Sequence, residues 1–232
     1  MYDASFTFTP DQRAIRDAVQ KICDKYGEQY WIDAEREHRF PEEFVREMAD
    51  HGWLGIAMPE EYGGGGMGIT EAAIMMQTVG QHGGAATSSI NVNVFGLHPV
   101  VRHGTDEQKR RWLPPMIQGK DRAAFGVTEP NAGLDTSRIE TRAVRDGGHY
   151  VVNGRKMFTT TAQSANKFML ITRTTPREEC EKTLEGLTLF YTDFDRSCIE
   201  AREVEKFVRH AVDINAVFID NLKIPVEDRI GE

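Results

Sequence analysis

The sequence FGVTEPNAGLD, residues 125–135, decides how the fold of this chain is interpreted. It continues a short β-type run that begins at Ala123 and then opens into a turn. Pro130 fixes φ in this turn, and Asn131 and Gly133 are residues that tolerate turn conformations. Such a turn exposes successive backbone N–H groups, with the hydroxyl of Thr128 at its mouth. The stretch therefore predicts a polar cradle.

A second stretch, KMFTTT at residues 156–161, completes the pattern. It follows DGG at 146–148 and NG at 153–154, two strong hairpin signals between alternating strands. Phe158 and Thr160 then end a strand, and an aromatic ring beside a hydroxyl suits a flat heteroaromatic ligand. We expect the two stretches to hold one planar cofactor between them. Ordinary hairpin chemistry explains the glycines equally well, but not the TEP turn or the FTT run.

Upstream of these stretches the apolar residues recur at helical spacing. Thr9 begins the first helix as its N-cap, with Pro10 at the first helical position and Gln12 completing a capping box. The other expected helices lie at residues 40–52, 70–79, within 87–102, and from a second capping box at 105–108 to 119. Five successive helices predict an α-helical domain over residues 1–120.

From Asp121 onward the pattern becomes that of β-strands. The expected strands are residues 123–127, 139–145, 149–152, 156–160, 168–174, 186–192 and 215–219. Seven short strands with turn residues between them predict a small barrel or sandwich over residues 121–232. The predicted fold class is α+β, with the all-α domain first.

Composition narrows the possible partners. The 232 residues carry a net charge of −8, which argues against a broad nucleic-acid or anionic-membrane surface. No apolar run reaches membrane-spanning length. The three cysteines are widely spaced and indicate reduced thiols, hence a cytoplasmic protein. The seven histidines lack metal-ligand spacing, so no metal site is expected.

The run GGGGMG at 63–68 satisfies the dinucleotide-binding pattern G-x-G-x-x-G. In that fold, however, a strand leads directly into the glycines, whereas here PEEY at 59–62 intervenes. The two acidic residues also have the wrong sign for a pyrophosphate site. We interpret the run as a flexible turn between helices.

Together, V-T-E-P-x-A-G-x-D from Val127 and x-N-G-x-K-x-F-x-T ending at Thr160 resemble the flavin-binding signature of the acyl-CoA dehydrogenase family. The order of elements is also similar to the first two domains of that family, which favours a β-barrel for the second. The resemblance implies FAD as cofactor and oxidation of the α,β C–C bond of an acyl-CoA thioester. It further implies electron-transfer flavoprotein, or a similar carrier, as electron acceptor.

The resemblance also assigns cofactor-binding residues: Phe125, Val127, Thr128, Gly133, Leu134, Phe158, Thr159 and Thr160. In the family pattern Thr128 bonds the pyrimidine edge of the flavin, Thr160 bonds near N5, and Phe158 packs against the ring. Taken alone, the two threonines could equally be an ordinary cross-strand hydroxyl pair.

Substrate contacts follow less directly. The resemblance places Asn91 and Phe95 near the acyl chain and Leu134 beside the cofactor or the acyl-CoA. The family often has Ser at this last position, and a leucine cannot make its hydrogen bond, so substrate preference stays open. Arg209 matches a family arginine, and a structural salt-bridged role is at least as consistent with it.

The segment from Ile224 to Glu232 is similar to one that leads into a C-terminal helical bundle in the family. That bundle supplies the catalytic carboxylate and the usual homotetramer contacts, and it is absent from these residues. No catalytic residue is therefore assigned. A mitochondrial matrix location would apply to a processed eukaryotic protein. The alternatives are a non-catalytic or truncated binding module, an acyl-CoA oxidase or an enoyl-thioester reductase; an acyl-CoA hydrolase is a further hypothesis.

Overall fold

A computed structural model describes residues 8–83 and 86–231. The chain forms two compact units, and each unit draws on several segments of the sequence. The first unit contains the residues up to Phe95 together with 112–120 and 207–212. The second unit contains 96–111, 121–206 and 213 onward.

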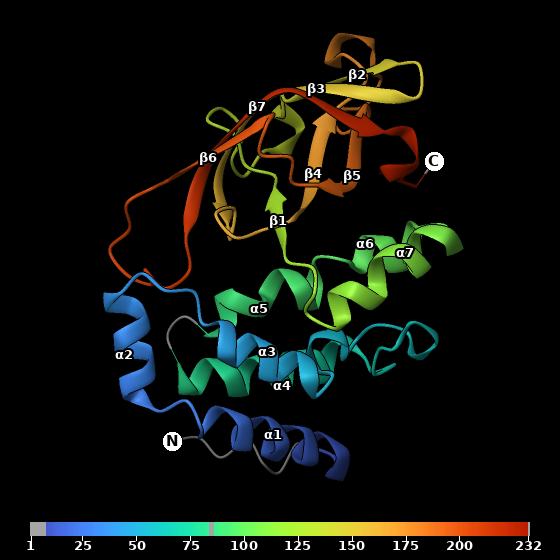
Figure 1. The fold of residues 1–232 in the computed structure, drawn as a ribbon. Helices are drawn as coiled ribbons and strands as arrows, with labels where there is room; N and C mark the ends of the chain where they lie inside the picture. The colour runs from blue at the N-terminus through green and yellow to red at the C-terminus, as the bar shows by residue number, and fades with distance from the viewer. Residues whose placement is uncertain (1–7, 84–85, 232) are drawn as a thin grey trace. The chain divides into compact units, whose positions relative to one another are not determined.

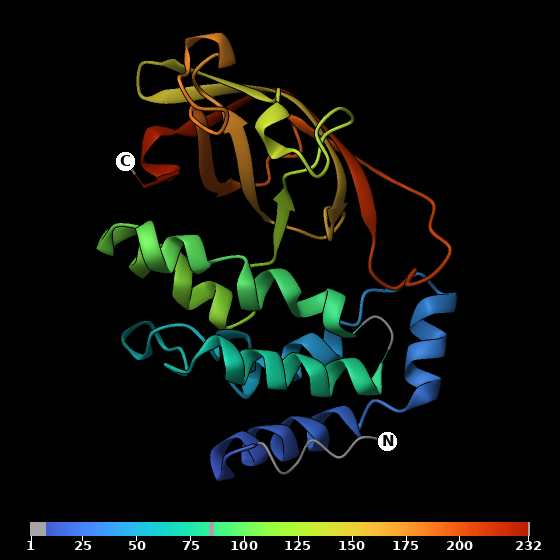
Figure 2. The same ribbon diagram turned by 180° about the vertical axis from the view of Figure 1, so that it is seen from behind.

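The first unit is helical. Its helices are α1 (Pro10–Cys23), α2 (Glu28–Arg36), α3 (Glu42–Asp50), α4 (Ile69–His82) and α5 (Ala86–Phe95), with the 3-10 turns η2 (Trp53–Gly55) and η3 (Glu60–Tyr62). Helix α4 lies between α1 and α5 in both views (Figures 1 and 2). Buried apolar side chains from these helices, including Val19, Phe44 and Met75, form one core.

The predicted capping box of α1 is present. Gln12 N donates to Thr9 Oγ1 at 3.2 Å, and Thr9 N donates to Gln12 Oε1 at 3.1 Å. The sequence interpretation misses α2, whose N-cap is Gly27 without a side-chain hydrogen bond and which buries only Trp31 and Ala34. A nine-residue helix with so short an apolar stripe gives little periodic signal.

The glycine run is a turn between helices that is hydrogen-bonded along its length. Gly65 N donates to Gly55 O at 2.9 Å, and Gly66 N donates to Met58 O at 2.8 Å. A Cβ placed on Gly64 would lie 2.2 Å from Met58 O, so only glycine allows this approach. The backbone donors of the run are used within the fold, which is not what a flexible turn or a phosphate loop requires.

Two further helices, α6 (His98–His103) and α7 (Asp106–Ile117), follow α5, where the sequence predicts one helix within 87–102 and another from 105. The capping box of α7 is present, since Gln108 N donates to Thr105 Oγ1 at 3.2 Å. The first part of helix α7, up to Arg111, belongs to the second unit, and the rest of the helix belongs to the first unit. No helix of the described residues is both long and apolar enough to cross a membrane.

The second unit is built on a mixed sheet. Its strands are β1 (Ala123–Gly126), β2 (Arg142–Asp146), β3 (His149–Thr160), β4 (Lys167–Arg173), β5 (Leu187–Asp193), β6 (Ile199–Glu203), β7 (Ile214–Pro225) and β8 (Arg229–Ile230). The order of neighbouring strands is β6-β7-β3-β2-β4-β5-β8, and β1 pairs in parallel with β4. The long strands β3 and β7 run side by side (Figure 1). The α+β prediction, helices first and sheet second, is confirmed.

The structure corrects one turn prediction. Asn153 and Gly154 lie inside β3, where the pairing with β7 shifts register between Val152 and Gly154. A Cβ on Gly154 would lie 2.5 Å from Oγ1 of Thr141, so this glycine allows a neighbouring segment to approach closely. The NG pair therefore lies within a continuous strand, opposite a bulge in β7 where Asp220 and Asn221 face Asn153 alone, instead of at a hairpin turn. Strands β6 and β8 were not predicted, because each is short and carries a weak pattern.

Candidate functional site

The two stretches that dominate the sequence lie side by side in the second unit. Met157 N donates to Thr128 O at 2.7 Å. Farther along, Thr161 Oγ1 donates to Ala123 O at 3.2 Å. The end of β3 is thus joined to the turn after β1 and to the start of β1 itself. This is the juxtaposition that the sequence predicts for one shared ligand.

A buried ion pair joins the same two stretches, and we call the place where they meet the junction. Lys156 Nζ lies 2.7 Å from Glu129 Oε1, and the two side chains are 0% and 5% exposed. Lys156 Nζ also donates to Val127 O at 3.1 Å. A buried charge needs a partner with good geometry, and here each charge has one.

Glu129 also organises the segment that follows the turn. Its carboxylate accepts hydrogen bonds from Glu140 N at 2.7 Å and from Thr141 N at 3.0 Å. Burial alone would raise the pKa of Glu129, but the charge and hydrogen bond of Lys156, with the bonds from residues 140 and 141, hold that pKa below its usual value. The carboxylate is therefore ionised and works as a cross-link.

Phe158 occupies a β-bulge. The pairing of β3 with β7 shifts register between Lys156 and Thr159, and Phe158 has φ of +57°. A bulky residue with positive φ is strained, and such strain gathers at functional sites. The ring is 60% exposed. A bulge changes the direction of a side chain, and the strained bulge at Phe158 directs its aromatic ring outward.

The predicted cofactor-binding residues fall into three groups by exposure. The first group is exposed: Phe125 is 39% exposed, Phe158 is 60% exposed, and Gly133 and Leu134 also lie at the surface. Val127, Thr128 and Thr160 are partly buried. Thr159 is 1% exposed, and its Oγ1 has no hydrogen-bond partner among the described residues. The assignment of these residues to a cofactor stays a prediction.

The predicted substrate residues Asn91 and Phe95 lie on α5 in the first unit. Asn91 is exposed, and Phe95 is partly buried against the helical core. Arg209 is also in the first unit, where its Nη1 donates to Ser88 Oγ at 3.2 Å. Leu134 belongs to the second unit. The proximity of Asn91, Phe95 and Leu134 to one substrate stays a prediction.

The residues present fit a flat aromatic cofactor in their chemistry. Two exposed aromatic rings, Phe125 and Phe158, stand on segments joined by the Met157–Thr128 bond, and an apolar ring left in water is free to cover a ligand face. The hydroxyls of Thr128 and Thr160 can bond the polar edge of such a ligand.

Sequence reasoning missed the residues that build the junction: Glu129, Lys156 and Thr161. The signal for the first two was a lysine in the otherwise apolar and hydroxyl-bearing run at 156–160, with two acidic residues, Glu129 and Asp135, in the preceding turn. A charged residue inside a buried strand requires a partner of opposite charge. That rule predicts an acidic partner for Lys156, and the structure identifies this partner as Glu129.

Comparison with known proteins assigns both parts of the chain to one family. The family model described as acyl-CoA dehydrogenase, N-terminal domain, matches residues 9–120, and the model for the middle domain of the same family matches residues 124–222.

Individual relatives agree with this match. Acyl-CoA dehydrogenase FadE12 of Mycobacterium tuberculosis is 31% identical over 231 residues, covering 100% of this chain and 59% of the relative. A 3-(aryl)acrylate reductase of Clostridium sporogenes is 31% identical over 229 residues, covering 97% and 59%. The crystal structure of an acyl-CoA dehydrogenase from Geobacillus kaustophilus superimposes with a TM-score of 0.89 at 28% identity, covering 97% and 59%. The chain thus spans 59% of the length of each of these proteins.

Proposed function

This chain belongs to the acyl-CoA dehydrogenase family, and from that premise we propose that it forms the flavin-binding part of an FAD-dependent enzyme that oxidises acyl-CoA thioesters to enoyl-CoA. The observation that carries the proposal is the junction of the two signature stretches, tied by the Met157–Thr128 bond and the Lys156–Glu129 ion pair.

We assign the FAD contacts to residues on both sides of this junction. Phe158 packs against the flavin ring, and Phe125 with Val127 borders it. Thr128 and Thr160 bond its polar edge, with Thr160 near N5. Gly133 and Leu134 border the cofactor from the turn, and Thr159 lies beside Thr160 on β3. When bound, FAD supplies the hydride acceptor for the β position of the substrate.

The substrate contacts proposed here are Asn91 and Phe95 for the acyl chain and Leu134 for the pantetheine region. Abstraction of the α proton needs a carboxylate, and hydrogen bonds must polarise the thioester carbonyl to make that proton acidic. We assign no residue of this chain as the base. Thr160 orients the flavin and does not accept the proton.

The proposal extends to partners and compartment. An electron-transfer flavoprotein or a similar carrier takes the electrons from the reduced cofactor, and the protein is a homotetramer if it contains a C-terminal helical domain. The cysteines Cys23, Cys180 and Cys198 are free thiols, which suits a reducing cytoplasmic compartment.

A second candidate is the reverse reaction, reduction of an enoyl thioester. One relative named above, at 31% identity, is a 3-(aryl)acrylate reductase. The same scaffold supports both directions, since fold does not fix reaction. The two candidates differ in the electron donor and acceptor that support turnover.

Flavin binding tests the proposal first. The purified chain should retain FAD, and Phe158→Ala should lower FAD affinity by about tenfold or more, because an aromatic contact contributes roughly 1.5 kcal/mol. Phe207→Ala is the matched control, since Phe207 is 97% exposed and belongs to the first unit. Flavin fluorescence titration gives both dissociation constants.

Two results would overturn the assignment. One is a chain that binds no FAD, and the other is an equal loss of affinity in Phe158→Ala and Phe207→Ala. Direction is tested separately, on the full-length protein, by anaerobic addition of acyl-CoA or enoyl-CoA. Bleaching of the flavin absorbance near about 450 nm by acyl-CoA supports dehydrogenation. Because the flavin half-reaction is reversible, the reductase is supported instead by steady-state turnover of enoyl-CoA with an added electron donor, without turnover of acyl-CoA with an added acceptor.

A further inference from the structure

Two residues with a left-handed backbone lie within four positions at the end of β3. Phe158 has φ of +57° and Thr161 has φ of +63°. Among the residues that the structure describes, Thr161 is the only β-branched one with positive φ. A β-branched side chain in this region is strained, and such strain persists only where surrounding contacts hold it. Thr161 directly follows Thr160, the residue assigned to the polar edge of the flavin.

The backbone of Thr161 is held on both sides. Its N–H donates to Asp213 O at 3.2 Å, and its carbonyl accepts from Ser164 N at 3.1 Å and from Ala165 N at 2.9 Å. The residue is 2% exposed. These bonds join the end of β3 to the residue before β7 and to the turn that follows β3. The fold therefore imposes the left-handed conformation on Thr161.

The hydroxyl of Thr161 fixes the peptide group on one side of Thr160. Thr161 Oγ1 lies 2.6 Å from Thr160 O and 3.2 Å from Ala123 O, and its one proton is shared between these two carbonyls. Thr160 O belongs to the peptide between residues 160 and 161. The hydroxyl therefore restricts the ψ rotation of Thr160 and ties this peptide to the first residue of β1.

The peptide group on the other side of Thr160 is also bonded. Asn215 Nδ2 donates to Thr159 O at 3.1 Å, and Asn215 is 0% exposed. Thr160 itself is paired with Ile214 of β7. A residue has only two soft backbone dihedrals, φ and ψ. With both flanking peptide groups held, the Cα–Cβ bond of Thr160 has a fixed direction.

We propose that Thr161 is a positioning residue for the flavin site: its hydroxyl, held by a left-handed backbone, directs the side chain of Thr160. The inference rests on the proposed function, which supplies the flavin and assigns Thr160 to the region of N5. Thr161 acts through Thr160, because its own hydroxyl is engaged by two carbonyls. A substitution at Thr161 should therefore alter the bound flavin without removing a group assigned to contact it.

Three variants separate the hydroxyl from the backbone strain. Thr161→Val keeps the β-branched shape and loses the hydroxyl, Thr161→Gly loses both the hydroxyl and the strain, and Thr161→Ser keeps the hydroxyl. Thr161→Gly should be more stable than Thr161→Val, because glycine adopts positive φ without strain.

The first measurement is the midpoint potential of the flavin-loaded protein. Thr161→Val and Thr161→Gly should each change the ratio of the affinities for oxidised and reduced FAD by about tenfold, the effect of one displaced hydrogen bond. For a two-electron couple this is a shift of about 30 mV. Thr161→Ser should keep the wild-type potential.

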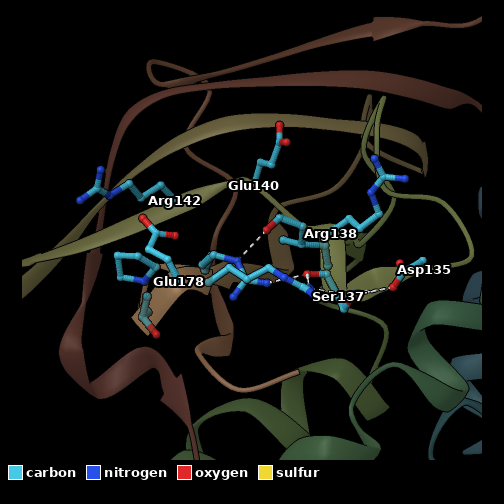
Figure 3. A pocket seen from close by; sticks show the side chains of 11 residues that line it. Asp135, Ser137, Arg138, Glu140, Arg142 and Glu178 are labelled. Atoms are coloured by element: carbon cyan, nitrogen blue, oxygen red, sulfur yellow. Dashed lines mark hydrogen bonds between the residues drawn. The ribbon is translucent and has the colours of Figure 1, made fainter. Parts of the chain in front are cut away.

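Thr174→Val is the matched control. Thr174 lines the pocket that Figure 3 shows from close by, together with Asp135 and Ser137. Its hydroxyl is also bonded within the fold, 2.7 Å from Thr188 Oγ1 and 3.3 Å from Gly186 O. Thr174→Val should lower stability as Thr161→Val does, but it should leave the midpoint potential unchanged. If the role of Thr161 were structural only, the two valine variants would have the same potential.

A second measurement needs no flavin. Residual dipolar couplings in nuclear magnetic resonance report the direction of the backbone bonds of Thr160. In the flavin-free protein, Thr161→Val and Thr161→Gly should change these couplings, whereas Thr161→Ser and Thr174→Val should not.

Three results would each overturn the inference. They are wild-type potentials in both Thr161→Val and Thr161→Gly, an equal shift of potential in Thr161→Ser and Thr161→Val, and unchanged dipolar couplings of Thr160 in the valine and glycine variants. Failure of the proposed function has a different result. The protein would then take up no FAD, while the couplings of Thr160 in its flavin-free form would still respond to Thr161→Val.

Discussion

Lys156 on β3 and Glu129 in the turn after β1 form a buried ion pair with an Nζ to Oε1 distance of 2.7 Å. The two residues belong to different signature stretches, so the pair joins the halves of the candidate flavin site. Lys156 also bonds Val127 O, and Glu129 also bonds the backbone of residues 140 and 141. One pair of side chains thus positions three segments of the second unit.

Removing one member of this pair should be costly. Lys156→Met leaves the Glu129 carboxylate buried without its partner, and we expect the free energy of unfolding to fall by about 3–5 kcal/mol. Urea denaturation followed by circular dichroism measures this change. Lys182→Met is the control, because the Lys182 side chain is 82% exposed and lies 4.0 Å from Glu185, a pair that contributes less than about 1 kcal/mol. Similar losses in the two variants would contradict the structural role of the buried pair.

The same pair predicts an acid dependence of stability. Because the folded-state pKa of Glu129 is lowered, its contribution is complete above the unfolded-state pKa of about 4.3 and is lost as pH falls through the folded-state value. Wild-type protein should therefore exceed Glu129→Gln in stability at pH 6, and the difference should shrink progressively below about pH 4. Chemical denaturation at a series of pH values gives the curve. A difference that stays constant down to pH 3 would argue against an ionised Glu129.

Much of this fold can be predicted from short stretches of the sequence. The capping boxes at Thr9 and Thr105 each act within four residues, and both are present in the structure. The change from helical to strand periodicity near Asp121 likewise depends on neighbouring residues only. The V-T-E-P and K-x-F-T-T stretches predicted that two segments meet, and the Met157–Thr128 bond shows that they do.

The remaining features depend on contacts between residues far apart in the chain. The residues next to Gly154 in the sequence indicate a turn, whereas its role in β3 depends on its close contact with Thr141. The importance of Lys156 depends on Glu129, and the role of Asn215 depends on Thr159 across the sheet. A pattern over neighbouring positions carries no information about the geometry of such contacts, so their distances and burial emerge only in the folded chain.

The close contact at Gly154 gives a test of the bulge. In Gly154→Ala the new Cβ would lie 2.5 Å from Oγ1 of Thr141 and 2.7 Å from its Cα, which forces one backbone to move. Overpacking of this kind costs about 1–3 kcal/mol of unfolding free energy. Gly148→Ala is the control, since a Cβ at Gly148 would meet nothing within 4 Å. If both variants unfold at the same urea concentration, the close approach of Gly154 to Thr141 is wrong.

Phe158 should show a conflict between stability and cofactor binding. Its φ of +57° is strained for any residue with a Cβ and is free of cost for glycine. Because the ring is 60% exposed, its removal loses little packing. Phe158→Gly should therefore be more stable than Phe158→Ala by about 1 kcal/mol, although glycine normally weakens a strand.

The same two variants should be alike in FAD affinity, because both lose the ring. This separates the two roles of the position: the backbone strain determines stability, and the aromatic ring determines binding. Thermal unfolding compares the stabilities, and flavin fluorescence titration compares the affinities. If Phe158→Gly is the less stable variant, the left-handed backbone at this position is not strained. If it binds FAD as well as wild type does, the bulge serves another ligand, and the strain that directs this ring outward has a different purpose.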